Sequence, residues 1–411
     1  MNRRRIPVVF VAPFFAETTL RFLSAAASLE GVALGLVTQE PASKIPRDLG
    51  RRLAGYHRVG DAFDADQLAN AVVAICGRRP PQRLIGALEQ LQVTLATVRE
   101  RLGIEGLGVE AAHNFRDKDR MKRVLRDAGV PCAAHGTAES IEEAIAVAER
   151  IGYPLVAKPP AGAAAANTVR VEDRQQLEGY LRLHRPVPGQ PLLLEEFVVG
   201  EEHSFDAISI HGKPVWHSLT HYRPGPLAVL ENPWIQWTVL LPREVDHPRY
   251  DDVRKVGAAT LGALGMGTGL THMEWFRRPD RSIAVSEIAA RPPGAQFTTL
   301  ISYAHDHDFY KAWGELMIFD RFVAPERAYA AGIAYLRGQG RGRVARIHGL
   351  EEAQKRWGSI VIETRLPRRG ALPASSYEGD GFVVVRDRST ERVAEALAGI
   401  VSTVRVELSE R

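Results

Sequence analysis

The chain has 411 residues, of which 45% are hydrophobic and 25% charged, with a formal net charge of +4. This composition excludes disordered and collagen-like chains and is typical of a globular protein with two or three domains. No apolar run reaches the roughly 18 residues of a membrane helix, and no signal-peptide pattern follows the arginine-rich start. We therefore expect a cytoplasmic protein that does not bind membranes. Without a long basic run or a nucleic-acid motif, binding of nucleic acid is not expected either.

The first hundred residues show a βαβ pattern. The apolar run Ile6–Ala12 predicts a buried parallel strand, followed by a helix over Thr18–Leu29 and a second strand over Val32–Thr38. A weaker repeat predicts a strand over Ala71–Cys76 and a helix near Arg83–Leu91. The pattern favours an open α/β domain. Because no GxGxxG sequence follows the first strand, we do not expect a dinucleotide site.

Two lysines occupy positions suited to anion binding. Lys118 lies in the first turn of a predicted helix. Ser140 and Glu143 form a capping box that opens another helix, which ends at Gly152. The next predicted strand delivers Lys158 just before the small-residue loop AGAAAANT. A lysine placed there fits phosphate binding, because backbone N–H groups of such a loop approach the anion closely. The alternative is that each lysine is a surface residue.

The stretch LLLEEFVVGEEHSFDAISI predicts two strands joined by a turn at Gly200, with Glu202, Ser204 and Asp206 on one face of the second strand. Buried carboxylates need a partner or a ligand. Adenosine would be such a ligand. Backbone groups around Glu195–Val198 would contact the adenine edge, and a later carboxylate would accept hydrogen bonds from the ribose hydroxyls.

The stretch HMEWFRRPDRSIAVSEIAARPPG predicts a hairpin with its turn at Pro279-Asp280. Period-2 alternation places one set of side chains on a single face of the two strands, namely His272, Glu274 and Phe276 on the first and Glu287, Ala289 and Arg291 on the second. Mg²⁺ binds one or two carboxylates together with phosphates, and arginine binds phosphate oxygens bidentately. The hairpin therefore indicates phosphoryl transfer. An ion-pair lattice on a solvated hairpin is the alternative.

An aromatic and basic stretch over residues 217–242 precedes this hairpin and is the expected substrate insert. Arg223 is a candidate partner for a substrate carboxylate, and Trp234 and Trp237 are candidates for an apolar wall. His272 completes the expected substrate contacts. A core strand followed by a proline-rich loop is the alternative interpretation.

Four motifs stand in order along the chain: RDK at 116–118, PLVAKP at 154–159, LEEFVVGEEHSFD at 194–206 and HMEW…SEIAARPPG at 272–294. Together they resemble the ATP-grasp superfamily, specifically its carboxylate–amine ligases, with likeness to biotin carboxylase and the L-amino-acid ligases. The resemblance implies a mixed α/β and α+β architecture. The expected domains are an N-terminal open parallel-sheet domain over 1–113, an ATP-grasp domain with two subdomains over 114–320, and a C-terminal α+β cap over 321–411.

The resemblance also implies site residues and the cofactors ATP and Mg²⁺, with Mn²⁺ as an alternative. By motif, the ATP phosphates would contact Lys118 and Lys158, and the ribose would contact Glu202. The adenine would contact Lys158, Glu195, Glu196, Phe197 and Val198. Glu274 and Glu287 would bind the metal, and Arg291 would bind the acyl phosphate. Two features depart from the family pattern. Ala289 stands where an asparagine ligand is usual, and the loop AGAAAANT keeps only one glycine.

The implied reaction activates a carboxylate as an acyl phosphate, which an amine then attacks. The expected partners are therefore small molecules, with amino acids among the candidates, and a homodimer is an open alternative. Two other functions also stay open: an ATP-grasp enzyme with another acceptor, such as bicarbonate or a thiol, and a nucleotide-binding module with degraded catalysis.

Overall fold

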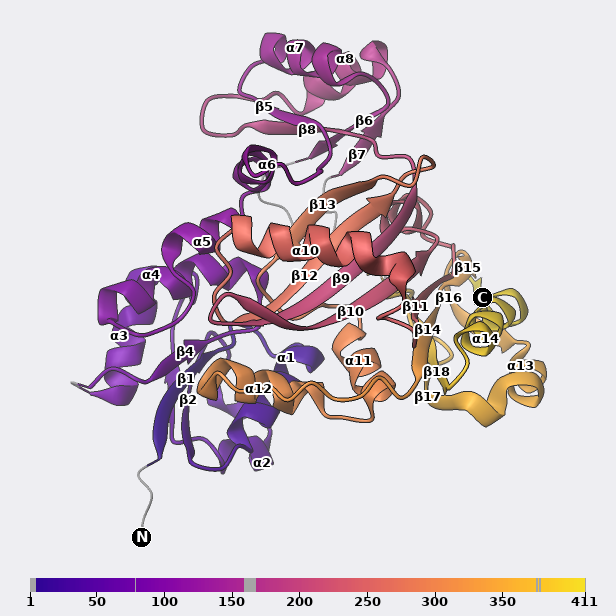
Figure 1. The fold of residues 1–411 in the computed structure, drawn as a ribbon. Coiled ribbons are helices and arrows are strands. Elements are labelled where there is room, and N and C mark those ends of the chain that lie inside the picture. The colour runs from indigo at the N-terminus through magenta and orange to yellow at the C-terminus, as the bar shows by residue number, and fades with distance from the viewer. Residues whose placement is uncertain (1–4, 78, 159–167, 375, 377, 411) are drawn as a thin grey trace.

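The computed structural model describes residues 5–77, 79–158, 168–374, 376 and 378–410. Figure 1 shows a parallel sheet with helices at the N-terminal end, a small lobe that carries α7 and α8, and a large central sheet that runs into the C-terminal region. No helix among these residues is long and apolar enough to cross a membrane.

The N-terminal sheet is parallel, with the strand order β3-β2-β1-β4. Its strands are β1 (Ile6–Val11), β2 (Val32–Thr38), β3 (Gly55–Arg58) and β4 (Arg83–Ile85). Its helices are α1 (Glu17–Ala27), α2 (Arg47–Gly50), α3 (Ala65–Cys76), α4 (Gln92–Leu102) and α5 (Val109–Asn114). The strand order reverses at β1, so the carboxyl ends of β1 and β4 flank the crevice where open α/β sheets bind ligands.

The weaker βα repeat was predicted wrongly. The expected strand Ala71–Cys76 is the second half of α3, and the expected helix near Arg83–Leu91 begins with β4. The carboxylate of Asp64 accepts hydrogen bonds from the backbone N–H groups of Asp66 and Gln67 and so caps α3. A short apolar run fits a strand or a buried helix equally well by periodicity, and here this upstream cap favours the helix.

The small lobe is an antiparallel sheet with the order β5-β8-β6-β7. Its elements are β5 (His135–Ala138), β6 (Leu155–Lys158), β7 (Val169–Val171), β8 (Leu192–Glu196), α6 (Lys118–Asp127), α7 (Ile141–Ile151) and α8 (Arg174–Leu183). The predicted capping box is confirmed, because the Ser140 hydroxyl accepts a hydrogen bond from the N–H of Glu143 at 3.1 Å. The strand predicted to deliver Lys158 is confirmed as β6.

The central sheet has eight antiparallel strands in the order β13-β12-β9-β10-β11-β14-β18-β17. They are β9 (Glu201–Ile210), β10 (Lys213–Arg223), β11 (Trp237–Leu241), β12 (Gly269–Arg277), β13 (Ile283–Ala289), β14 (Ala330–Leu336), β17 (Val361–Arg365) and β18 (Gly381–Asp387). Its helices are α9 (Pro226–Glu231), α10 (Asp251–Ala263), α11 (Phe297–His305) and α12 (Phe309–Phe319). The predicted hairpin is confirmed as β12-β13, with Glu274 directly opposite Glu287.

The expected boundary at residue 320 falls between strands of this one sheet, because β14, β17 and β18 continue it. The C-terminal region adds a three-stranded sheet with the order β15-β19-β16. Its elements are β15 (Gly338–Gly340), β16 (Arg343–His348), β19 (Arg405–Ser409), α13 (Leu350–Trp357) and α14 (Thr390–Thr403).

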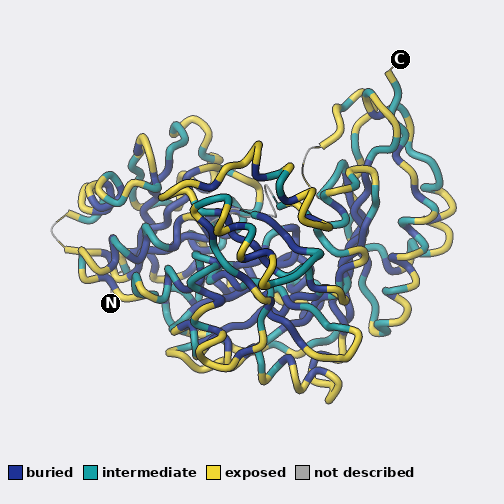
Figure 2. The backbone as a smooth tube through the Cα atoms, turned by 90° about the horizontal axis from the view of Figure 1, so that it is seen from above, coloured by how far each residue is buried: buried dark blue, intermediate teal, exposed yellow. Residues whose placement is uncertain are grey.

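One apolar core joins the N-terminal sheet to the central sheet. Phe22 of α1 packs against Tyr310 and Trp313 of α12, with ring centroids 4.7 and 4.9 Å apart. All three side chains are buried in a cluster that continues to the central strands. Figure 2 shows this buried interior as a continuous dark-blue region. The packing holds the crevice at β1 and β4 against the central sheet.

Candidate active site

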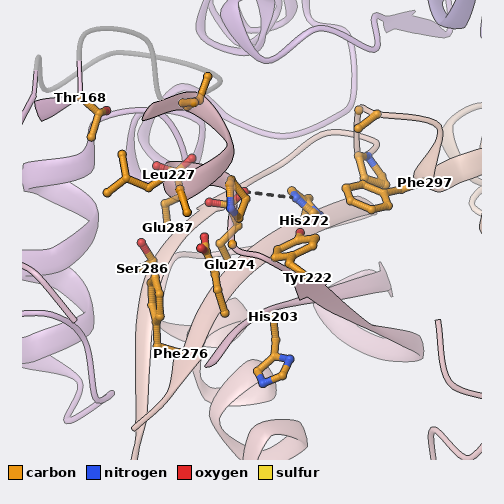
Figure 3. Close-up of a pocket in the computed structure, with 18 of the residues that line it drawn as sticks. Thr168, His203, Tyr222, Leu227, His272, Glu274, Phe276, Ser286, Glu287 and Phe297 are labelled. Carbon is orange, nitrogen blue, oxygen red and sulfur yellow. Dashed lines mark ion pairs between the residues drawn. The ribbon is translucent and has the colours of Figure 1, made fainter. Parts of the chain in front are cut away.

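A cavity of about 900 Å³ lies where the N-terminal crevice, the small lobe and the central sheet meet. The central sheet contributes several of the residues labelled in Figure 3, among them Tyr222 from β10, His272 and Glu274 from β12 and Glu287 from β13. The small lobe contributes Lys118 from α6 and residues of β6 and β8 to the cavity wall. The predicted loop AGAAAANT lies outside the described residues except for Thr168, which lines the cavity.

Glu274 and Glu287 form a pair of acids on the cavity wall. Their side chains keep 28% and 24% exposure, so both can reach a ligand. The ammonium of Lys118 lies 2.8 Å from the Glu287 carboxylate. Burial opposes ionisation of Glu287, but Lys118 and Lys158 hold the pKa of its carboxyl well below the ordinary value. Two carboxylates supply the oxygen donors that Mg²⁺ prefers.

The two acids alone do not complete a metal site. Among the described residues, no group of three or more His, Cys, Asp and Glu side chains is arranged to hold a metal ion. A magnesium ion bound to Glu274 and Glu287 would therefore take its other ligands from phosphates and water, as this ion commonly does.

A buried lysine pair surrounds Glu195. Lys158 and Lys122 lie 2.6 and 2.7 Å from its two carboxylate oxygens. Lys122 has no exposed surface, and both lysines lower the pKa of Glu195 against the opposing effect of burial. The sequence prediction missed Lys122. Its spacing of four residues from Lys118, on one face of α6, is the signal that could have identified it.

Glu202 lies at the start of β9 and lines the cavity. Burial, followed by the charges of Glu274 and Glu287, raises the pKa of its carboxyl well above the ordinary value. Gly225 packs against it so closely that a Cβ atom at this position would lie 2.5 Å from a Glu202 carboxylate oxygen. The loop after β10 therefore rests directly on this acid.

The expected adenine contacts form one end of the cavity. Phe197 and Val198 line it together with Val156 and Phe276, which makes a largely apolar slot. The guanidinium of Arg170 lies 4.1 Å from the Phe197 ring centroid.

Glu196 also lines this end of the cavity. Its two carboxylate oxygens lie 2.7 and 2.9 Å from a guanidinium nitrogen of Arg278, and one accepts from the N–H of Ala134. The Glu196 side chain is therefore already bound by protein groups.

His272 lines the cavity and lies between the acid pair and Phe297 (Figure 3). Its Nδ1 atom is 2.7 Å from the carboxylate of Asp206, and its Nε2 atom is 3.7 Å from that of Glu274. Burial opposes the charged form, yet Asp206 raises the pKa of His272 to about 9. Ala289 is its cross-strand neighbour; it is buried and is not among the cavity-lining residues.

The raised pKa predicts how His272 affects stability. A His272→Gln variant loses the stabilising free energy of the charged imidazole beside Asp206. This stabilisation is fully present below about pH 6.5 and disappears as pH rises through about 9. Wild type should therefore exceed the variant in free energy of unfolding by on the order of 3 kcal/mol at pH 6, and by little above pH 9.5. Urea unfolding of both proteins across this range measures the difference. A difference that does not change with pH would contradict the charged His272–Asp206 pair.

The opposite end of the cavity is lined by aromatic and polar side chains. Of the expected substrate residues, Arg223, Trp237 and His272 line the cavity, whereas Trp234 is 55% exposed and does not. Trp237 is buried and stacks on Tyr335 at 4.4 Å between ring centroids. Several lining residues were not predicted, namely Thr18, Thr19, Phe22, Glu89, Phe297 and Glu378.

Arg291 lies on the cavity wall near this end. Its Nε is 3.3 Å from the Glu89 carboxylate, which also binds Arg116 at 2.8 Å. One Nη atom donates to the carbonyl of Pro292 at 3.1 Å. Glu89 follows β4, so the N-terminal crevice helps to orient the arginine. Glu89 could not be identified from its own short stretch because its partner lies about 200 residues away.

Comparison with known proteins agrees with this architecture. Residues 117–202 match the family model of the ATP-binding domain of the carbamoyl-phosphate synthase L chain. The carbamoyl phosphate synthase large chain of Methanothermobacter thermautotrophicus is 26% identical over 255 residues, 60% of this chain and 23% of that protein. The L-arginine-specific L-amino acid ligase of Bacillus subtilis is 24% identical over 252 residues, 59% of each chain. The chain thus spans less than a quarter of the first relative and more than half of the second.

Two solved structures match over nearly the whole chain. The L-amino acid ligase from Bacillus licheniformis has a TM-score of 0.77 at 20% identity, covering 99% of this chain and 100% of that one. The N5-carboxyaminoimidazole ribonucleotide synthetase from Thermotoga maritima has a TM-score of 0.70 at 18% identity, covering 98% and 100%. The fold expected from the four motifs is therefore confirmed: the chain has the ATP-grasp fold, as the matching ligase structures do.

Proposed function

We propose that the protein is an ATP-dependent ligase that activates a carboxylate as an acyl phosphate and joins it to an amine, releasing ADP and phosphate. One observation carries the proposal: the acids Glu274 and Glu287 and the cations Lys118, Lys158 and Arg291 all line one cavity. Phosphoryl transfer needs positioned cations and metal-binding carboxylates around the phosphates, and it needs no protein nucleophile. The similarity to L-amino acid ligases supports this choice of reaction.

ATP would lie between the small lobe and the central sheet. Its adenine fits the slot beside Phe197 and Val198, and its ribose hydroxyls would be accepted by Glu202. Its phosphates would reach Lys118 and Lys158. Because Lys118 is paired with Glu287 at 2.8 Å, the phosphates would compete with that carboxylate for the lysine.

Glu274 and Glu287 would hold Mg²⁺, with Mn²⁺ as an alternative. When bound, the ion neutralises charge that develops on the transferred phosphoryl group. The carboxylates fit this ion because both are oxygen donors that keep partial exposure to the cavity.

The chemistry proceeds in two steps. A carboxylate oxygen of the substrate attacks the γ-phosphorus, the new O–P bond forms, and the bond to the bridging oxygen breaks with loss of ADP. The amine nitrogen then attacks the acyl carbon, forms the C–N bond, loses a proton and expels phosphate. Arg291 would stabilise the negative charge of the acyl phosphate through its planar guanidinium, which a point charge cannot replace.

The substrates we propose are small molecules, with amino acids as the leading candidates for both carboxylate and amine. They would occupy the end of the cavity beyond His272, where Arg223 and Trp237 line the wall. We further propose a cytoplasmic location, because the reaction consumes ATP, and leave a homodimer as an arrangement to be tested. Nucleic acid is not among the proposed partners.

A substrate panel tests the proposed function. Phosphate release from MgATP should require one carboxylic acid and one amine together, and mass spectrometry should detect the amide. Release that depends on bicarbonate would favour a carboxylating enzyme instead. Nucleotide binding without turnover on any pair would favour a module with degraded catalysis, and both outcomes would contradict the proposal.

The ribose contact predicts a change in nucleotide affinity. Glu202→Ala should weaken nucleotide binding about fivefold, because the ribose hydroxyls would lose a hydrogen-bond acceptor that contributes roughly 1 kcal/mol. Calorimetric titration with MgADP measures the effect, and Glu178→Ala is the matched control because Glu178, on α8, is not among the cavity-lining residues. Equal affinities in wild type and Glu202→Ala would remove this acid from the nucleotide site.

A further inference from the structure

Glu378 brings a carboxylate from the C-terminal region into the cavity. It lies in the segment before β18 and lines the cavity together with Thr18, Phe22 and Phe297. These neighbours come from the N-terminal domain and from α11. Glu378 therefore belongs to the end of the cavity that we assign to substrate.

Three other acids of the cavity have cationic partners, whereas Glu202, which we assign to ribose, and Glu231 form no ion pair among the described residues. Glu89 binds Arg116 and Arg291, Glu195 binds its two lysines, and Glu287 binds Lys118. Among the described residues, no lysine, arginine or histidine forms an ion pair with Glu378. A half-buried carboxylate without a cation in a ligand cavity is suited to a ligand that supplies the charge.

The nearby arginines are already engaged. Arg365 lies 3.0 Å from Glu17, and Arg21 lies 2.9 Å from the other carboxylate oxygen of Glu17. Burial and the charge of Glu17 raise the pKa of Glu378, and the lowering effects of Gln296 and Arg365 do not offset them. The surrounding protein therefore supplies too little positive charge to balance an ionised Glu378 carboxylate.

Gln296 orients this acid. Its side-chain carbonyl accepts a hydrogen bond from the Thr299 hydroxyl at 3.0 Å, which leaves its amide NH₂ to donate to Glu378. Ala295 and Gln296 both adopt left-handed backbone conformations, with φ of 48° and 64°. Such conformations cost roughly 1 kcal/mol or more in residues other than glycine, and they persist where the surroundings enforce them. The buried turn thus holds the amide against the carboxylate.

We propose that the substrate end of the cavity selects an amino acid or short peptide whose side chain ends in an ammonium or guanidinium group, with Glu378 as the group that binds this charge. The inference rests on the proposed function only in taking this end of the cavity as the substrate site. The apolar walls formed by Phe22, Trp237 and Phe297 would contact the aliphatic part of such a side chain.

Binding of matched probes tests the proposal without requiring turnover. Arginine and citrulline have nearly the same shape but differ in charge, as do lysine and norleucine. With MgADP present, the full-length protein should bind arginine about tenfold to a hundredfold more tightly than citrulline, since a charged hydrogen bond is at stake. Glu378→Gln should remove this preference, and Glu378→Asp, which keeps the charge, should retain part of it.

Two controls separate the outcomes. Glu351→Gln, an exposed acid at the start of α13, should keep the wild-type preference. MgADP affinity should be unchanged in Glu378→Gln, which shows that the variant is folded. Equal binding of arginine and citrulline by wild type, or an unchanged preference in Glu378→Gln, would overturn the inference. Failure of the ligase reaction alone would instead appear as selective binding without phosphate release.

Discussion

Replacing Glu287 by glutamine is expected to lower kcat by about 10²- to 10³-fold, which is typical for loss of one group that stabilises developing charge. Glutamine keeps the shape but removes the negative charge that faces Glu274 across the β12-β13 pair. ATP affinity should change much less, because the substitution also frees Lys118 from its 2.8 Å ion pair and leaves its charge to the phosphates. Phosphate-release rates and nucleotide titrations separate the two effects.

The matched control is Glu178→Gln, which removes the same charge from the surface of α8. It should turn over at the wild-type rate. If Glu287→Gln also does so, the β12-β13 hairpin is structural and the proposed metal site is not at these acids.

Replacing Glu195 by glutamine is expected to cost about 3–5 kcal/mol of unfolding free energy, the usual result of removing one partner from a buried ion pair. Lys122 is fully buried and Lys158 nearly so, and both depend on this carboxylate for compensation. Without it, the fully buried Lys122 ammonium would have no carboxylate partner and would lie close to the Lys158 ammonium at the cavity wall. Urea unfolding at neutral pH measures the loss.

The adjacent acid provides the control. Glu196 forms an ion pair with Arg278, and more than a quarter of each side chain is exposed to solvent. Glu196→Gln should therefore cost less than about 1 kcal/mol. Equal losses of unfolding free energy in the two variants would show that the Lys122–Glu195–Lys158 cluster stabilises the fold no more than the exposed Glu196–Arg278 pair does.

Local periodicity predicted the strands that carry several residues of the candidate site. The hairpin carrying Glu274 and Glu287 could be identified because its alternation and its turn residues agree, and the structure places the two acids directly opposite each other. Lys158 could be located because an apolar strand and a small-residue loop flank it. These signals are contained within short stretches of the chain.

Contacts between distant segments could not be predicted in this way. Arg291 is oriented by Glu89, which lies about 200 residues earlier in the chain. Glu378 reaches the cavity from the segment between β17 and β18. Trp234 and Trp237 look alike in sequence, yet strand pairing buries Trp237 in β11 while Trp234 stays exposed. Tertiary packing decides such positions.

In the proposed reaction, a carboxylate oxygen of the substrate attacks the γ-phosphorus of ATP. Once the panel has identified a productive pair, the acid labelled with ¹⁸O in both carboxylate oxygens tests this step directly. One ¹⁸O should appear in the released inorganic phosphate for each amide formed, and ADP should be the nucleotide product. Unlabelled phosphate, or release of AMP with labelled oxygen, would contradict it.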